Sequence, residues 1–176
     1  MRARRSTVSK GELLVDGSDA TFRGFIHDFL AFAARVHEVR DRFGKTIGLS
    51  GPGYSTLISI AHLEEEHGVG VNRVAGHLHV SGAFITVEVA KLVRAGLVTK
   101  RPNAADKRRV LLTITHAGRS LLDELAPVQA PVNDALFDAL GAAEFLALKT
   151  TIGKLVGCGD RALALIDYRE SMRSSA

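Results

Sequence analysis

The chain has 176 residues, of which 46% are hydrophobic and 24% charged, as in ordinary globular proteins. No run of 18 apolar residues occurs, which excludes a membrane-spanning helix, and the single cysteine, Cys158, excludes an internal disulfide framework. No apolar segment follows the N-terminal arginines, so we expect no secretory signal and a cytoplasmic protein, whose formal net charge is +4.

The first helix is expected after a basic arm. Residues 1–20 show no hydrophobic periodicity and predict a mobile arm that begins with four basic and no acidic residues in 1–10. From Thr21 to about Arg42, apolar residues recur at steps of three and four, which predicts a long amphipathic helix. This stretch is rich in phenylalanine, and a helix so apolar needs a partner surface within the subunit or across a dimer.

Three further helices are predicted in the middle of the chain. A segment rich in glycine and proline ends the first helix, and a second helix is expected over 54–66. Two short helices follow over 71–78 and 82–95, and Ser81 suits the N-cap of the latter. The three glutamates at 64–66 are interpreted as a solvated helix end.

A two-stranded hairpin is predicted next. Residues 97–100 and 109–115 are expected to form two short strands, the second of which alternates in hydrophobicity, with a turn-rich segment between them. Residues 100–109 hold five basic side chains against only Asp106, which makes this short segment +4. A basic patch on an otherwise acidic body indicates contact with a polyanion, although a solvated loop gives the same pattern.

Helices are predicted to end the chain. A long helical pattern starts near Thr115, in which Pro127 and Pro131 are expected to kink or break the helix. A last helix is expected over 142–168. The fold class is therefore mainly α with a small β wing.

The two short helices and the hairpin together predict a winged helix-turn-helix. A helix fits the DNA major groove, where base edges differ, and a basic hairpin tip can reach an adjacent minor groove or the backbone. The side chains expected to anchor the second short helix are Val80, Ile85, Val89 and Leu92. The residues left near DNA are Gly82, Ala83, Phe84, Thr86 and Val87.

These segments resemble the MarR family of transcriptional regulators. Residues 78–98 resemble its recognition region, and residues 100–118 resemble its wing. The family's wing carries an Asp-x-Arg turn, matched by Asp106 and Arg108, and a strand ending in Leu-Thr-x-x-Gly, matched at 114–118 with isoleucine for leucine.

The resemblance implies a homodimer whose first, fifth and sixth helices interlock. It further implies that Asp106 pairs with Arg108 at the wing tip and that Arg108 enters the minor groove. The expected division is a basic flexible arm over 1–20 and a single domain over 21–176, with dimerisation helices over 21–43 and 116–168 and a winged-helix region over 54–115. The expected dimer contacts are Phe22, Phe25, Phe29, Leu136, Leu140, Phe145, Leu148 and Leu155.

The expected DNA contacts lie on the two short helices and the wing. They are Arg73, Ser81, Gly82, Ala83, Phe84, Thr86, Val87, Lys91, Arg101, Asp106, Lys107, Arg108 and Arg109. The family often has polar residues where this chain has small or apolar ones, so Ser81 and Thr86 are the best hydrogen-bonding candidates, with Glu88 a candidate for a cytosine amine. Specificity would then rest on thymine methyl groups or DNA shape, or DNA binding would be altered.

The function implied is that of a homodimeric repressor released by a small phenolic or anionic effector, without cofactor or enzymatic activity. The residues expected to line the effector pocket are Phe29, Phe32, His37, Tyr54, Leu57 and His62. Two alternatives stay open, a winged-helix interaction module with weak DNA binding and a metal-responsive regulator. The histidines lack ligand spacing, Cys158 lacks a resolving partner, and no phosphate-loop or hydrolase motif occurs.

Overall fold

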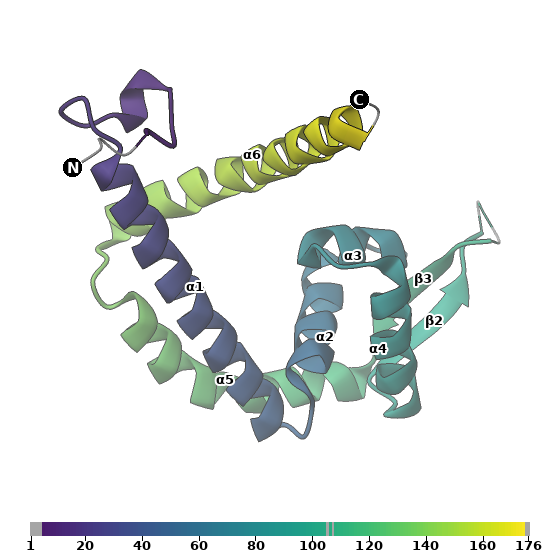
Figure 1. Ribbon diagram of the computed structural model, residues 1–176. Coiled ribbons are helices and arrows are strands. Elements are labelled where there is room, and N and C mark those ends of the chain that lie inside the picture. Colours follow the sequence, from purple (N-terminus) through teal and green to yellow (C-terminus); the bar gives the residue numbers. More distant parts are fainter. Residues whose placement is uncertain (1–4, 105, 107, 175–176) are drawn as a thin grey trace. The chain divides into compact units, whose positions relative to one another are not determined.

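The computed structural model describes residues 5–104, 106 and 108–174, and it confirms a mainly helical chain with a small sheet (Figure 1). The helices are α1 (Ala20–Thr46), α2 (Gly51–Leu63), α3 (Val71–Leu78), α4 (Gly82–Arg94), α5 (His116–Phe137) and α6 (Ala142–Ser174), and a 3-10 turn spans Gly11–Leu13. The strands are β1 (Val69–Gly70), β2 (Val98–Pro102) and β3 (Val110–Ile114). Among the described residues, no helix combines the length and apolar character needed to cross a bilayer.

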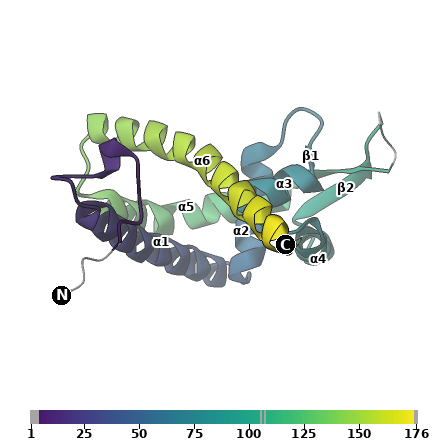
Figure 2. The same cartoon turned by 45° about the horizontal axis from the view of Figure 1, so that its top comes forward.

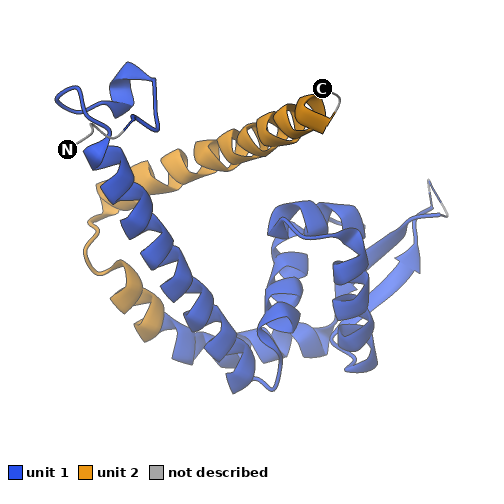
Figure 3. Ribbon diagram, in the orientation of Figure 1, with its two compact units in different colours: residues 1–130 blue, residues 131–176 orange. Residues whose placement is uncertain are grey.

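The chain divides into two compact units, residues 1–130 and 131–176 (Figure 3). The first contains α1–α4, the sheet and the first part of α5. The second contains the rest of α5 and α6, where the rings of Phe137 and Phe145 meet edge to face at 6.4 Å between centroids. None of the described residues of α6 is buried, so this helix has no core of its own to stabilise it.

The sheet holds the wing. Its strands are antiparallel in the order β1-β3-β2, and β2 pairs with β3 from Val98 opposite Ile114 to Pro102 opposite Val110. The hairpin extends away from the helices α2–α4 (Figure 2). Strand β1, with Val69 opposite Leu112, was not predicted because two residues are too few to show alternation.

The core of the first unit surrounds α2, which packs against α1, α3, α4 and β3. Leu57 and Ile60 on α2 are fully buried, and so are Val74 on α3, Ile85 on α4 and Leu112 on β3. These contacts fix the two short helices and the wing on one hydrophobic cluster. The relative placement of α4 and the wing therefore depends on α2.

The motif at 114–118 joins the wing to α5. The Thr115 hydroxyl accepts the Gly118 backbone N–H at 3.0 Å and donates to the Gly96 carbonyl at 2.7 Å. The Thr115 backbone N–H donates to the Leu97 carbonyl at 3.0 Å. A Cβ on Gly118 would overlap that carbonyl and lie 2.7 Å from Ile114 Cγ1, so glycine is required by close approach.

Replacing Gly118 with alanine is expected to destabilise the first unit by about 2–3 kcal/mol, because the methyl group meets backbone that cannot give way. Urea unfolding followed by circular dichroism measures this loss. The control is Gly76→Ala, since a Cβ at Gly76 has no neighbour within 4 Å. An unfolding free energy unchanged by Gly118→Ala would contradict the packing described for the motif.

The prolines were expected to kink or break α5, and the expectation of a break was wrong. The helix runs from His116 to Phe137 through both Pro127 and Pro131. Each proline removes one backbone N–H from the helix, but both lie at exposed positions, where solvent can hydrogen-bond the carbonyls left without a partner.

The described part of the N-terminal arm is anchored to the start of α1, whereas residues 1–4 lie outside the described residues. The Thr7 backbone N–H and hydroxyl donate to Asp19 Oδ2 at 2.8 and 2.7 Å, and Arg23 pairs with the other oxygen of this carboxylate. The bonds from Thr7 are the main cause that lowers the pKa of Asp19. The prediction of a mobile arm missed this anchor because a single aspartate gives no sequence pattern.

Candidate nucleic-acid interface

Helix α4 presents one face to the core and one to solvent. Ser81 caps it, with the hydroxyl oxygen accepting the Phe84 backbone N–H at 3.1 Å. Ile85, Val89 and Leu92 are buried, as predicted. Of the residues expected near DNA on and before this helix, Gly82 is half-buried. The exposed ones are Ser81, Ala83, Phe84, Thr86 and Val87. This exposed face is nearly free of long polar side chains.

Two expectations about α4 were wrong. Val80 is 39% exposed instead of anchoring the helix, and it directly follows His79, the C-cap of α3, which adopts the left-handed conformation (φ 52°). Glu88, considered for a cytosine amine, is only 4% exposed. It lies one helical turn from Ile85 and Leu92 and so shares their buried face, where its carboxylate binds Lys91 Nζ at 2.6 Å.

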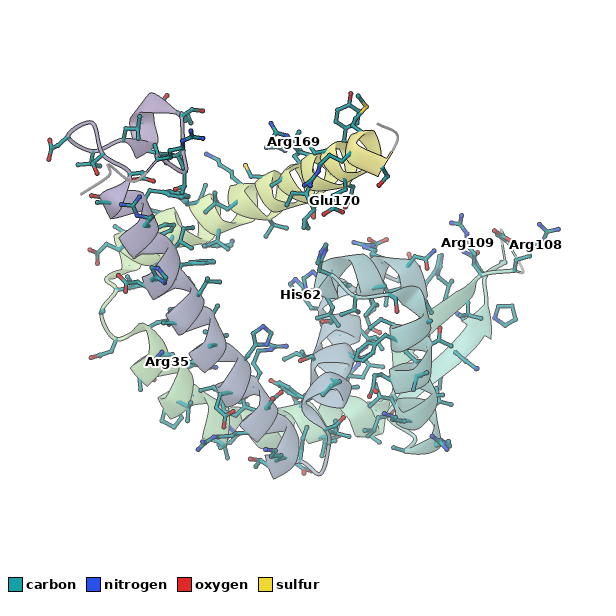
Figure 4. All side chains as sticks on the ribbon, viewed as in Figure 1. Arg35, His62, Arg108, Arg109, Arg169 and Glu170 are labelled. Carbon is teal, nitrogen blue, oxygen red and sulfur yellow. The ribbon has the colours of Figure 1, made fainter. Side chains whose placement is uncertain are left out.

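The wing tip is held by Asp106, but not as expected. One carboxylate oxygen accepts the Arg108 backbone N–H at 3.1 Å, and the other pairs with Arg109 Nε at 3.2 Å. The expected pair between the Asp106 and Arg108 side chains is replaced by this turn. The Arg108 side chain forms no ion pair with any described residue and projects at the tip beside Arg109 (Figure 4). Lys107 lies outside the described residues.

A hollow of about 510 Å³ lies between the start of α3, helix α4 and the wing. Its polar lining includes three arginines from two elements. The lining residues are Gly70, Val71, Asn72, Arg73, Thr86, Arg108, Arg109 and Val110. Positive charge is therefore concentrated beside Thr86 on the exposed face of α4, and such a surface attracts phosphate groups.

Two of the expected cationic contacts are held by the loop after α2. Arg73 pairs with Glu65, and Arg101 Nη2 donates to the His67 carbonyl at 3.0 Å. Glu64 accepts the Ile114 backbone N–H at 3.0 Å and pairs with Arg119. The interpretation of 64–66 as a solvated helix end was therefore wrong for Glu64, whose side chain is only 10% exposed, whereas Glu65 stays exposed to solvent despite its ion pair. Their partners are distant in sequence, so no local pattern could have shown them.

The residues expected at an effector pocket divide into two sets. Tyr54 and Leu57 on α2 are buried, whereas Phe29, Phe32 and His37 on α1 and His62 on α2 are exposed. Around Tyr54 the structure adds two residues that sequence reasoning missed. The Arg40 guanidinium lies 5.3 Å from the centre of the Tyr54 ring, and Gln129 donates to the Tyr54 hydroxyl at 2.7 Å.

His62 forms a ring contact with His77 on α3, at 5.9 Å between centroids. Desolvation lowers the pKa of His77 below its usual 6.5, and the charges of His62 and Arg40 lower it further. Figure 4 shows His62 on α2. No group of three or more metal-ligating side chains occurs within the described part of the chain.

The lowered pKa of His77 predicts acid destabilisation. The unfolded chain binds a proton at His77 more readily than the folded chain does. The folded state therefore has its full stability above pH 6.5, where His77 is neutral in both states, and loses stability as the pH falls from 6.5 through the lower folded-state pKa. The difference between the urea midpoints at about pH 7.5 and pH 5.5 should therefore be smaller in His77→Gln than in the unmodified protein. The control is His27→Gln, at an exposed position of α1. An equal pH response in both variants would contradict the assignment.

The residues expected at a dimer interface are all left at least partly open. On α1, Phe25 and Phe29 are 53% and 39% exposed, and on α6 Phe145, Leu148 and Leu155 are 48%, 37% and 44% exposed. Phe22, Leu136 and Leu140 are half-buried. The only cysteine, Cys158, is exposed on α6, with Arg161 Nη2 at 3.1 Å from its sulfur.

Comparison of the sequence with known proteins finds a partial match to a transcriptional repressor, whereas no protein-family model matches the chain. Over 83 residues the chain is 28% identical to the HTH-type transcriptional repressor NicR of Pseudomonas putida; the match covers 47% of this chain and 52% of NicR, about half the length of that relative.

Solved structures resemble the chain over a larger share of its length. A mutant of MarR from E. coli in complex with operator DNA has a TM-score of 0.61 and 20% identity, covering 77% of this chain and 94% of MarR. CouR from Rhodococcus jostii RHA1 bound to p-coumaroyl-CoA has a TM-score of 0.64 and 22% identity, covering 76% of this chain and 90% of CouR. The chain therefore has the winged-helix fold of MarR regulators.

Proposed function

We propose that this chain, with its MarR fold, is a homodimeric DNA-binding transcriptional regulator. The observation that carries the proposal is the arginine-lined hollow between α3, α4 and the wing, next to the exposed face of α4. A helix of this size fits the major groove, while the arginines beside it meet the phosphate backbone. A cytoplasmic location and the absence of enzymatic activity belong to the same proposal.

Recognition of bases is proposed to depend on methyl groups. Ala83, Thr86 and Val87 are exposed on α4 and suit contact with thymine methyl groups. The Thr86 hydroxyl donates to the Gly82 carbonyl at 2.8 Å, so within the helix its methyl group is the free end. The Ser81 oxygen accepts the Phe84 N–H, which leaves its own O–H for a base or phosphate.

Affinity is proposed to come from the wing and its surroundings. Arg108 would enter the minor groove, where the negative potential favours a guanidinium, and Arg73 and Arg109 would contact phosphates. Sequence discrimination would then be modest and binding strongly dependent on salt. The apolar exposed face of α4 favours this proposal, in which the wing supplies affinity and α4 supplies base recognition.

Dimer formation is proposed to cover the exposed apolar residues of α1 and α6. Large patches of this kind on a monomer are uncommon and mark an interface. Two copies related by a twofold axis would place their recognition helices for half-sites roughly 34–36 Å apart on a pseudo-palindromic operator.

The effector is proposed to be a small phenolic or anionic molecule that binds near α1 and α2. The Tyr54 ring and His62 belong to the expected pocket and provide an aromatic surface, and Arg40, which lies over the Tyr54 ring, adds positive charge. CouR, which shares the fold, was solved with p-coumaroyl-CoA, a phenolic thioester. Effector binding would favour a spacing of the recognition helices that no longer fits the operator, which makes the chain a repressor.

A mobility-shift assay tests the proposed function, with DNA that flanks the chain's own gene and a titration of phenolic acids. Binding that is released by one of these acids is expected. The absence of any shift on the flanking DNA and on unrelated duplexes would favour a protein-interaction module instead.

A further inference from the structure

We propose that Glu65 is a built-in competitor of the DNA phosphates, because it occupies Arg73 at the edge of the arginine-lined hollow. The inference rests on the proposed function and adds to it a residue that sets how tightly the chain binds a duplex. Glu65 lies in the loop between α2 and β1, outside the segments assigned to DNA contact.

The geometry places the two side chains on one surface. Glu65 Oε1 pairs with Arg73 Nη1, and Arg73 is the third residue of α3 and lines the hollow with Arg108 and Arg109. The loop is fixed by a turn in which the Gly68 backbone N–H donates to the Glu65 carbonyl at 2.8 Å. Strand β1 then begins directly at Val69 and pairs with β3 of the wing. The backbone contacts therefore fix the loop that carries Glu65, and the ion pair places its carboxylate on Arg73, which lines the hollow.

The pair is open to solvent and therefore weak. The side chains of Arg73 and Glu65 are 54% and 69% exposed, and exposed ion pairs contribute little to stability. The pair is thus poorly suited to hold the fold together. Its charges, however, lie where a phosphate would approach, so the carboxylate repels the phosphate and also neutralises the arginine that would bind it.

The other arginines of the hollow are in different situations. Arg109 is paired with Asp106 inside the wing turn, where the carboxylate also holds the Arg108 backbone, so removing Asp106 would disturb the wing. Arg108 forms no ion pair with any described residue. Glu65 is thus the carboxylate whose removal changes the charge at the hollow while leaving the wing turn intact.

The expected effect follows from Coulomb's law. Phosphate binding must replace the attraction between Glu65 and Arg73, which for opposite charges about the width of a guanidinium group apart in water is equivalent to about threefold in affinity. Glu65→Gln should therefore bind duplex DNA about threefold more tightly for each subunit in contact at low salt. The freed Arg73 should steepen the dependence of log affinity on log salt by up to about one counterion per subunit.

The experiment measures fluorescence anisotropy of a labelled mixed-sequence duplex of about 30 base pairs at several salt concentrations. The matched control is Glu66→Gln, the same charge change in an exposed neighbour that forms no ion pair with a described residue. In an Arg73→Gln background, Glu65→Gln should raise the affinity for the duplex by no more than Glu66→Gln does. Urea unfolding should be the same for both glutamine variants.

The outcomes separate the two proposals. Competition between Glu65 and the DNA phosphates is supported if Glu65→Gln raises the duplex affinity more than Glu66→Gln does. This excess must disappear when Arg73 is replaced. Equal gains in the two variants, with the unmodified protein binding the duplex, overturn the competition and leave the DNA-binding function standing. Weaker binding by Glu65→Gln also overturns it, because Glu65 would then orient Arg73 toward phosphate. Failure of every variant to bind a duplex overturns both proposals.

Discussion

Replacing Arg108 with alanine is expected to lower the affinity for duplex DNA about tenfold for each wing in contact, because one groove or phosphate contact is lost. The loss should be similar across sequences, and the salt slope should fall by about one counterion or less per wing. The side chain is exposed and forms no ion pair with a described residue, so the unfolding free energy should not change.

Fluorescence anisotropy of duplex binding at several salt concentrations measures this effect. The control is Arg35→Ala, which removes an equal charge from α1, where the guanidinium bonds only the Ala31 carbonyl of its own helix at 2.8 Å among the described residues. If Arg108→Ala binds as well as the unmodified protein, the wing has no part in the mechanism.

Replacing Leu155 with glutamate is expected to abolish the dimer at micromolar concentration. Leu155 is 44% exposed within the subunit, so the subunit's own fold tolerates the change, but in a dimer the carboxylate would be buried without a partner. Loss of the dimer should also weaken operator binding strongly, because each half-site would then bind alone.

Light scattering measures the mass, and circular dichroism checks that the helices remain. Lys149→Glu, on the same helix at an exposed polar position, serves as the control and should stay dimeric. A dimeric Leu155→Glu variant would show that the apolar surface of α6 does not form the interface. A monomeric unmodified protein would contradict the dimer altogether.

The sequence predicted those parts of the fold that local patterns determine. The helix over Val71–Leu78 was predicted to the residue, and Ser81 caps the next helix as expected, because capping and periodicity act within one turn. The wing strands were placed within two residues at each end for the same reason. The family resemblance identified Gly118, and the structure explains it by the nearby Leu97 carbonyl.

The errors concern interactions between distant segments. Pro127 and Pro131 looked like breaks because a local rule forbids interior prolines, yet α5 continues where solvent can satisfy the freed carbonyls. Glu88 looked like a possible base contact until the packing of α4 on α2 placed it inside. The partners of Glu64 and Glu65 lie 8 to 55 residues away and follow from the tertiary fold alone.

Charge gives the clearest link between sequence and proposed function. The +4 of the whole chain is a weak signal, whereas the +4 of residues 100–109 lies on a hairpin whose tip exposes Arg108. Arg73, distant in sequence, joins the arginines of the tip at one hollow. The neighbouring face of α4 is apolar, so affinity and base recognition are expected to reside on different elements.

The most direct test of the central claim is selection of duplexes from a random pool by the unmodified protein, followed by affinity measurements over a range of salt. The account predicts enrichment of pseudo-palindromes with half-site centres about 10 base pairs apart, and affinity that falls steeply with salt. A pool without enrichment, together with duplex binding that is absent or independent of salt, would contradict a DNA-binding regulator built on α4 and the wing.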